Sequence, residues 1–522
     1  MQRLSLVWFK RDLRVHDHAA LCEAAREGAV LPVFVVEPRI LGADDGDALH
    51  YGFIRECLLE LRESLAAMGQ PLRVFVGETV DIFEALRTRF GFTRIYAHQE
   101  TGNALTYARD LAVLDWARTN GIEVCEFAQH GVVRRLQDRN GWARQWRTLM
   151  DSAQYDLPDR LTGPPVEDIG DIPTGQNLGL TAYHPAVATR SQVQRGGEQA
   201  AIATLESFLR ERGQHYQRQI SSPSSAYRHG SRISAYLAYG ALSLRRTVQQ
   251  TEHSDLPARA RRSFTSRLHW HCHFMQKLES QPSIESRCFN PCYESLRDDG
   301  NDPLLLQSWQ QGLTGFPFVD ACIRSLQTHG WINFRMRAML VSFAAYDLWL
   351  DWRLFSSFLA RQFLDYEPGI HLSQVQMQSG TTGINTPRMY NPVKQGFDHD
   401  PHAQFIRRWV PELAALPTPF VHEPWALSPI EAQAAEFRPG VDYPLRCVDH
   451  RQAIRRAREQ IAVVRRSGAH RGAAARVFDQ HGSRRAQRDR MTSNAYRERR
   501  LKGSDAPRFD APKDEGQLTL FD

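Results

Sequence analysis

The sequence predicts an N-terminal α/β domain, built on a doubly wound, Rossmann-like parallel sheet, followed by an all-helical domain. Three observations support this. The 522 residues exceed what one hydrophobic core holds, strand and helix patterns alternate over residues 1–130, and helical patterns dominate residues 201–462. We place a connector at residues 131–200 and a basic, unstructured tail at residues 463–522.

The α/β domain is predicted from short apolar stretches with helical segments between them. Strands are expected at residues 4–9, 29–36, 72–76, 93–97 and 123–127. The helical patterns are clearest at residues 17–27 and 52–69, and such alternation gives a parallel sheet covered on both faces. No Gly-x-Gly-x-x-Gly string follows the first strand, so a dinucleotide fingerprint of that type is absent.

The connector and the helical domain differ in composition. Prolines and glycines crowd residues 131–200, which show little periodicity. Helical patterns follow at residues 200–211, 232–239 and 316–328. Residues 331–352, rich in apolar and basic side chains, are expected to form one further long helix.

Composition excludes several classes of protein. No secretory signal and no apolar stretch of about 18 residues occurs, so we expect a soluble, cytoplasmic protein, with a monomer as the default. The eight cysteines contain no Cys-x-x-Cys pair and are expected to be reduced thiols. His269 and His273 could share a helix face, but without a nearby carboxylate we expect no metal site.

The tail carries most of the net charge of +6. Residues 465–502 hold twelve Arg or Lys against three Asp or Glu. Such arms bind polyanions through counterion release, although a solvated tail without a partner fits the charge equally well. The chain ends in a string that resembles the bacterial sliding-clamp-binding pentapeptide and implies that clamp as a partner, through Gln517, Leu518, Leu520 and Phe521.

Three segments of the helical region carry candidate chemistry. Small and hydroxyl residues at 230–243 open a helix whose N–H groups could bind a phosphate near Arg232, although an ordinary helix cap explains them too. Arg337 lies in a stretch built for burial and needs an anion such as Asp365, in a site or in a structural ion pair. The third segment, residues 390–413, contains Phe-Ile-Arg-Arg-Trp-Val-Pro-Glu-Leu.

In this order, and with Trp-Phe-Lys-Arg-Asp-Leu-Arg at residues 8–14, the segments closely resemble the DNA photolyase/cryptochrome family. The resemblance runs from residue 1 to about residue 460, and its most specific strings are at residues 314–320 and 406–413. It implies an antenna domain, a connector and a helical domain that holds FAD. It also implies a second, antenna chromophore of the folate or deazaflavin type.

The resemblance also assigns roles to single positions. It implies FAD contacts at Tyr216, Ser231, Arg232, Ile233, Ser234, Arg337, Asp365 and Gly369. Gly369 stands where the family usually has an Asn or Asp that faces the flavin N5. It implies that Trp270 stacks on the damaged bases, and it implies further DNA contacts at His271, Arg335 and Arg388. The catalytic positions would be Trp270, Trp352, Arg337 and Asp365.

Several positions depart from the family pattern. Trp352 corresponds to the middle member of the family's chain of three electron-transferring tryptophans, but the other two fall on Ser373 and Asp299. Val375 replaces a second tryptophan of the pocket, and Arg267 stands where a carboxylate is expected. The sequence therefore resembles class I photolyases but belongs to a divergent branch in which the usual chain is broken.

The resemblance implies light-driven repair of damaged DNA. Such a deoxyribodipyrimidine photo-lyase splits cyclobutane pyrimidine dimers by electron transfer from excited reduced FAD. Photoreduction would need another route, through Trp349 or Tyr366, or cellular reductants. A cryptochrome-type blue-light photoreceptor without repair activity is the alternative, and DNA binding without catalysis is a third interpretation. Paired histidines typical of (6-4) repair enzymes are not evident at residues 331–335, which favours cyclobutane dimers.

Overall fold

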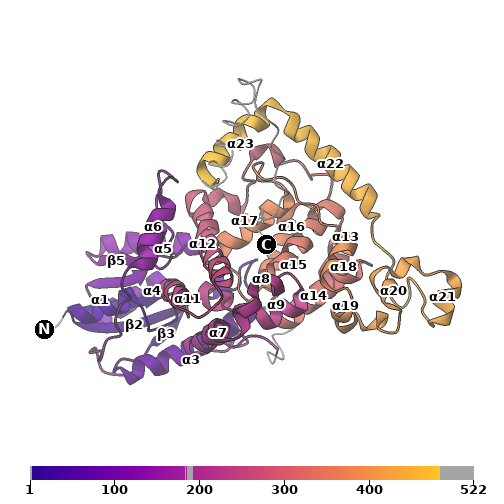
Figure 1. Ribbon diagram of the computed structural model, residues 1–522. Coiled ribbons are helices and arrows are strands. Elements are labelled where there is room, and N and C mark those ends of the chain that lie inside the picture. Colours follow the sequence, from indigo (N-terminus) through magenta and orange to yellow (C-terminus); the bar gives the residue numbers. More distant parts are fainter. Residues whose placement is uncertain (1–2, 168, 183, 185–191, 483–522) are drawn as a thin grey trace, which may run out of the picture.

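Five parallel strands form the core of the N-terminal domain in the computed structural model (Figure 1), which describes residues 3–167, 169–182, 184 and 192–482. The strand order is β3-β2-β1-β4-β5, with bounds β1 Leu4–Phe9, β2 Ala29–Val36, β3 Arg73–Val76, β4 Arg94–His98 and β5 Glu123–Phe127. The chain first builds outward from β1 to β3 and then returns to the other side of β1 at β4. The sheet therefore has its switch point between β1 and β4, the place where such sheets bind ligands.

Helices cover both faces of this sheet, which confirms the predicted doubly wound domain. They are α1 Ala19–Glu27, α2 Pro38–Leu41, α3 Ala48–Ala67, α4 Thr79–Phe90 and α5 Ala104–Thr119. Alternate residues of β1 enter different cores, because side chains of a strand point alternately to its two faces. Val7 and Phe9 belong to the core that continues into the helical domain, whereas Leu6 and Trp8 pack with residues of α4 and α5.

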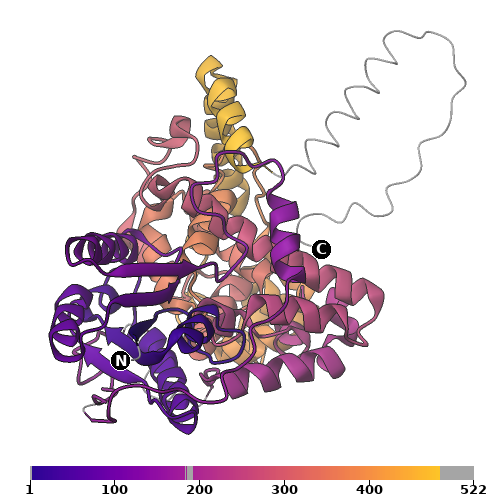
Figure 2. The same ribbon diagram turned by 90° about the vertical axis from the view of Figure 1, so that its left-hand side faces the viewer.

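The helical domain packs on one side of the N-terminal domain (Figures 1 and 2). In the described part of the connector lies α6 Trp142–Asp151. The helices that follow are α7 Glu198–Arg210, α8 Tyr216–Gln219, α9 Pro223–His229, α10 Ser234–Ala238, α11 Leu244–Glu252, α12 Ala258–Ser280, α13 Pro303–Gln311, α14 Pro317–His329, α15 Phe334–Ser342, α16 Trp352–Gln362, α17 Pro368–Ser379, α18 Pro392–His399, α19 Gln404–Trp409, α20 Thr418–His422, α21 Pro429–Ala434, α22 His450–Arg466 and α23 Gly468–His481. No helix in the described ranges is long and apolar enough to cross a membrane.

The predicted long helix over residues 331–352 is wrong. Helix α15 ends at Ser342 and passes into a π-helical turn, η5 Phe343–Asp347. Trp349 then adopts a left-handed backbone with φ of 57°, and the Asp351 side chain caps α16 by accepting a hydrogen bond from the N–H of Arg353. The apolar pattern runs through this break because the residues on both sides of it are buried in one core.

The predicted start of the unstructured tail at residue 463 also needs correction. Ser467 caps α23, and Ala473, Val477 and His481 of that helix are buried. Helices α22 and α23 form the yellow arm in Figure 1. The folded region therefore extends to about residue 481, while the clamp-like string at residues 517–521 lies outside the described residues.

The two domains are joined where the turn after α10 meets the loop after β1. Arg11 Nε donates to the carbonyl of Ala238 at 2.7 Å, and Arg14 Nη1 donates to that of Gly240 at 2.9 Å. Gly240 has φ of 64°, and a Cβ added there would lie 2.0 Å from the carbonyl oxygen of Arg11 and 2.5 Å from Asp12 Cα. Only glycine permits this contact between the domains.

Replacing Gly240 with alanine should therefore destabilise the protein more than a left-handed residue alone would. Gly91→Ala is the matched control, because Gly91 has φ of 67° but open space around its Cα. The control should lose about 1–2 kcal/mol of unfolding free energy, the cost of a left-handed alanine. Gly240→Ala should lose clearly more in urea unfolding, and equal losses would contradict the close contact.

Candidate functional site

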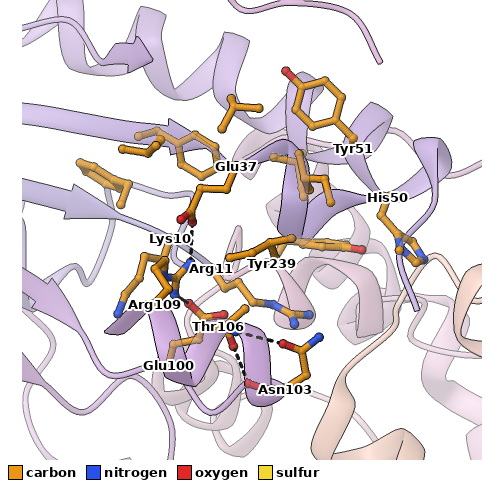
Figure 3. Close-up of a pocket in the computed structure, with 18 of the residues that line it drawn as sticks. Lys10, Arg11, Glu37, His50, Tyr51, Glu100, Asn103, Thr106, Arg109 and Tyr239 are labelled. Carbon is orange, nitrogen blue, oxygen red and sulfur yellow. Dashed lines mark hydrogen bonds and ion pairs between the residues drawn. The ribbon is translucent and has the colours of Figure 1, made fainter. Parts of the chain in front are cut away.

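A first cavity lies at the carboxyl ends of the strands, against the helical domain (Figure 3). We call it the sheet-edge cavity. Its empty space is about 910 Å³, which includes solvent at its open mouth, and its lining includes Trp8, Phe9, Lys10, Phe34, Val36, Glu37, Ile40, Tyr51, Arg109, Tyr239 and Tyr366. The strands β1 and β2 end in its wall, next to the switch point of the sheet. Its place suits a ligand-binding site.

The charges in the sheet-edge cavity are paired with one another. Arg109 contacts Glu37 at 3.1 Å and Glu100 at 2.6 Å. Lys10 Nζ lies 3.0 Å from Asp110. Because these charges already have partners, a ligand in this cavity would be held mainly by apolar contacts. Such a lining suits a planar ring system with few ionised groups.

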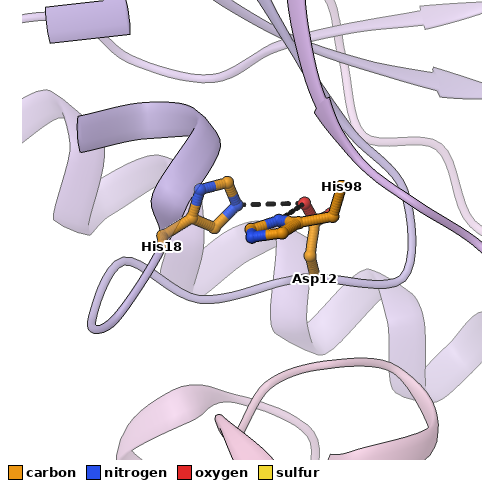
Figure 4. A group of neighbouring side chains, drawn as sticks. All are labelled: Asp12, His18 and His98. Carbon is orange, nitrogen blue, oxygen red and sulfur yellow. Dashed lines mark hydrogen bonds and ion pairs between the residues drawn. The ribbon is translucent and has the colours of Figure 1, made fainter. Parts of the chain in front are cut away.

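Next to this cavity, Asp12, His18 and His98 form a buried group (Figure 4). The N–H of Leu21 donates to His18 Nδ1, so the proton of His18 is on Nε2, which lies 3.0 Å from Asp12 Oδ2. His98 Nδ1 lies 2.7 Å from the same oxygen. Burial alone would raise the pKa of Asp12, but the two histidines outweigh burial and hold it well below its usual range. Three such groups could hold a metal ion, yet their contacts already explain them as a clamp between the β1 loop and β4.

A second cavity, of about 1190 Å³, lies among α9, α10, α12, α15 and the segment before α17. We call it the helical-domain cavity. It brings together most of the positions that the sequence singled out: Tyr216, Ser231, Arg232, Ser234, Trp270, His271, Arg335, Arg337 and Asp365. These positions are spread over about 150 residues of sequence, so the fold and not local sequence gathers them.

An ion pair closes the inner end of this cavity. Arg337 Nη1 and Nη2 donate to the two carboxylate oxygens of Asp365 at 3.0 and 2.9 Å. The Asp365 side chain is 5% exposed. Burial would raise its pKa, but the charge and hydrogen bonds of Arg337 outweigh burial and lower it. A paired, charged carboxylate and guanidinium therefore stand side by side in the cavity wall.

Arg232 has an environment that calls for an anion. Its guanidinium lies over the rings of Tyr227 and Trp331, at 4.3 and 4.0 Å from their centres. Burial lowers its pKa to about 10. Its Nη1 atom is buried and has no hydrogen-bond partner among the residues that the structure describes. Because a buried cation needs an anionic partner, this atom indicates a negatively charged ligand.

Trp270 presents an aromatic ring to the same cavity. It stacks on Phe274 with ring centres 5.6 Å apart and meets His273 edge-on at 4.7 Å. Its neighbour His271 has a pKa lowered to about 4 by burial and is therefore neutral at pH 7. A supported, partly buried ring of this kind can stack on a nucleobase.

Four predicted site residues line neither cavity. Ile233 is buried in the core that the two domains share, and Trp352 is buried in a second large core within the helical domain. The carbonyl of Arg388 accepts a hydrogen bond from Ser342 at 3.2 Å. Gly369 packs against α12, where an added Cβ would lie 2.6 Å from Met275 Cα. The glycine permits this close packing of α17 on α12, and its predicted contact with FAD stays a prediction.

A small recess extends the helical-domain cavity past Asp365. Residues that the sequence had not identified as cofactor contacts line it, among them Tyr366, Glu367, His371, Gln374, Val375 and Gln378. Glu367 is 5% exposed, its Oε1 has no partner in the described region, and Arg11 lies 3.5 Å from its Oε2. Gln374 Nε2 also has no partner there. Only burial distinguishes Glu367 and Gln374, and local sequence does not report it.

Comparisons with known proteins agree with this architecture. The family model described as "DNA photolyase" matches residues 5–141, and that described as "FAD binding domain of DNA photolyase" matches residues 264–463. A deoxyribodipyrimidine photo-lyase of Escherichia coli is 30% identical over 86% of this chain and 96% of its own. A cryptochrome DASH of Gloeobacter violaceus is 28% identical over 85% and 93%. The crystal structure of a class III photolyase from Agrobacterium tumefaciens has a TM-score of 0.79 at 26% identity, over 90% of this chain and 98% of its own.

The buried Glu367 carboxyl should make stability depend on pH. Burial raises its pKa from 4.5 to about 7. Because the folded protein then binds an extra proton between these values, unfolding free energy should fall as pH rises from 5 to 8, by up to about 3 kcal/mol. Glu367→Gln should remove this part of the pH dependence in urea titrations. Glu63→Gln, on the exposed face of α3, should keep it, and parallel profiles for all three proteins would contradict the assignment.

Proposed function

Because the chain belongs to the DNA photolyase/cryptochrome family and carries its FAD-binding domain, we propose that it is a deoxyribodipyrimidine photo-lyase. It would split cyclobutane pyrimidine dimers in damaged DNA under blue light. The observation that carries the proposal is that one cavity offers both a stacking ring, Trp270, and a buried cation, Arg232, whose Nη1 has no hydrogen-bond partner among the described residues. A cofactor and a base could meet in that space. A DNA substrate is consistent with the cytoplasmic location expected from the sequence.

The cavity fits FAD by its donor groups. Arg232, with its free Nη1, would hold the diphosphate together with Ser231 and Ser234, beside the ring of Tyr216. Arg337 and Asp365 would stand next to the isoalloxazine ring, where the guanidinium favours its reduced, anionic state. When bound, reduced FAD supplies the electron that splits the dimer after light absorption.

The DNA side of the cavity is formed by Trp270, His271 and Arg335. A dimer turned out of the duplex would stack on Trp270, because unstacked bases bind aromatic faces. Arg335 and, further out, Arg388 would contact phosphates and set the register of the duplex. The apolar walls around Ile332 and Phe334 would exclude water from the reacting bond.

The sheet-edge cavity would hold the second, light-harvesting chromophore. Its apolar lining and paired charges suit a planar ring of the folate or deazaflavin type. It lies beside the recess of the helical-domain cavity, since Tyr366 borders both. Light absorbed there would be collected close to the flavin.

A cryptochrome-type photoreceptor without repair activity is the second candidate. The similarity to a cryptochrome DASH supports it, and so do two departures from the electron chain. Ser373 is fully buried without an aromatic ring, and the side chain of Asp299 is 73% exposed. Both departures weaken light-driven reduction of the flavin through the tryptophan chain.

Repair of a dimer-containing oligonucleotide under blue light tests the proposal. The unaltered protein should bind the damaged strand and restore it, whereas a photoreceptor would leave the dimer intact. Trp270→Ala should weaken binding of the damaged strand by about 1–3 kcal/mol, the worth of one stacked base, while the visible spectrum of bound FAD stays unchanged. Trp270→Phe, which keeps a flat ring, should bind nearly as well as the unaltered protein.

The C-terminal string would tether the enzyme to the bacterial sliding clamp and raise its local concentration at replicating DNA. Removing residues 517–522 should abolish binding to purified clamp, as should the pair Leu520→Ala and Phe521→Ala. Thr519→Ala is the matched control, because Gln and the Leu–Phe pair are the groups that would fill the groove. Equal clamp binding by all variants in surface plasmon resonance would dismiss the tether.

A further inference from the structure

Tyr366 stands in the wall that the two cavities share. It lines the sheet-edge cavity on one side and the recess beside Arg337 and Asp365 on the other. Among the residues that line the recess it is the one tyrosine, and no tryptophan lines it. An oxidisable ring is thus placed next to the ion pair that would border the flavin.

The hydroxyl of Tyr366 has a built-in proton acceptor. It donates to Asp45 Oδ2 at 2.6 Å, and Asn103 Nδ2 donates to the same oxygen at 2.9 Å. Burial, together with the negative charge of Asp45, raises the pKa of Tyr366 well above 10. The ring therefore keeps its proton in the resting protein. It would release the proton only when it loses an electron, because an oxidised phenol is strongly acidic.

Both domains hold the ring in this position. The carbonyl of Tyr366 accepts a hydrogen bond from Arg11 Nη2 at 2.7 Å. The ring lies parallel to His50 of α3, with centres 6.0 Å apart, and edge-on to His371 of α17 at 5.3 Å. Tyr366 comes from the segment before α17, whereas Asp45 comes from the loop before α3. The pairing of tyrosine and carboxylate is thus set by the packing of the domains.

The tryptophans that the sequence offers for the same task lie elsewhere. Trp352 is 1% exposed within the second large core and lines neither cavity. Trp349 is also buried there, and its Nε1 points to Asp299 at 3.3 Å. Neither of these two rings has a carboxylate acceptor in contact with the recess. Tyr366 both lines the recess and has a carboxylate, Asp45, that can accept its proton.

We propose that Tyr366 is the electron donor that reduces the oxidised flavin under light, with Asp45 as the acceptor of its proton. The inference rests on the proposed FAD site. Tyr366 gives one electron to the light-excited flavin and its hydroxyl proton to Asp45 Oδ2. The tyrosine becomes a neutral radical, Asp45 becomes a neutral carboxylic acid, and the flavin gains one electron.

The proton transfer keeps charge from building up at a buried site. A cationic tyrosine radical would be costly in a low-dielectric wall, whereas transfer to Asp45 leaves both partners neutral. Asp45 is partly exposed at the sheet-edge cavity and can release its proton to solvent. A small thiol entering that cavity then restores the tyrosine by giving up a hydrogen atom and becoming a thiyl radical.

The test uses the FAD-bound protein, illuminated without oxygen in the presence of dithiothreitol. The unaltered protein should show a tyrosyl radical by electron paramagnetic resonance, narrowed when its tyrosines are ring-deuterated, and its flavin absorbance should bleach. Tyr366→Phe should lose this radical and bleach more slowly. Asp45→Asn, which keeps the size but not the acceptor, should bleach about 100-fold more slowly, the typical worth of a positioned base. Tyr346→Phe is the control, because Tyr346 is fully buried in the second large core and lines neither cavity.

Bleaching of Tyr366→Phe at the rate of the Tyr346→Phe control overturns the inference. If Tyr366→Phe loses FAD, two other measurements decide: ring deuteration of the unaltered protein, and the Asp45→Asn variant. A radical signal that neither of them changes overturns the inference. Failure of repair is a separate result. If the protein is photoreduced through Tyr366 but repairs no dimers, the inference stands and the proposed repair function is wrong. If the protein repairs dimers and Tyr366→Phe does not change its photoreduction, the repair function stands and the inference is wrong.

Discussion

The ion pair between Arg337 and Asp365 is the constraint on which both cavities depend. A buried carboxylate beside a partly buried guanidinium is tolerated only as a pair with good geometry, and the bidentate contact supplies that geometry. Arg337 is held in turn by the carbonyl of Ile332, which its Nε contacts at 2.8 Å. Asp365 therefore has one permitted position, and the chain that follows it must start from there.

That chain, residues 365–368, forms the partition between the cavities. Asp365 and Glu367 face the recess, Pro368 faces the sheet-edge cavity, and Tyr366 borders both. Arg11 reaches across from the N-terminal domain to the carbonyl of Tyr366 and the carboxylate of Glu367. The packing of the two domains against each other therefore also sets the shape of the recess. A shift at Gly240, where the same loop meets α10, would be felt in the recess.

Local sequence was sufficient for the strands, because buried parallel strands are short apolar stretches bounded by turns. The expected strands at residues 4–9, 29–36 and 123–127 have the bounds found in the structure. It was insufficient at residues 331–352, where the apolar pattern continues through the left-handed Trp349. Period alone cannot register such a break, since both flanks are buried in the same core.

The site residues likewise fall into those that local sequence identified and those that it did not. The strings around Ser231 and Arg337 were recognisable, and the fold brings them into one cavity. The FAD contact predicted at Gly369 stays a prediction, because a glycine required by close packing on α12 looks the same in sequence as one required by a ligand. Glu367 and Gln374 carry no local signal at all. Their unsatisfied atoms exist only because distant helices cover them.

The two cavities differ in how their charges are balanced, and this difference supports the ligands proposed for them. In the sheet-edge cavity Arg109 and Lys10 are neutralised by carboxylates of the same domain, so an added anion would meet no free cation in its described lining. In the helical-domain cavity Arg232 has burial and two aromatic rings but no carboxylate in contact. A ligand with a diphosphate gains the most binding free energy beside a buried cation that lacks a hydrogen-bond partner among the described residues. Its binding offsets the cost of having desolvated that cation. This balance supports the proposal that the dinucleotide would bind at Arg232 and the less charged ring at the sheet.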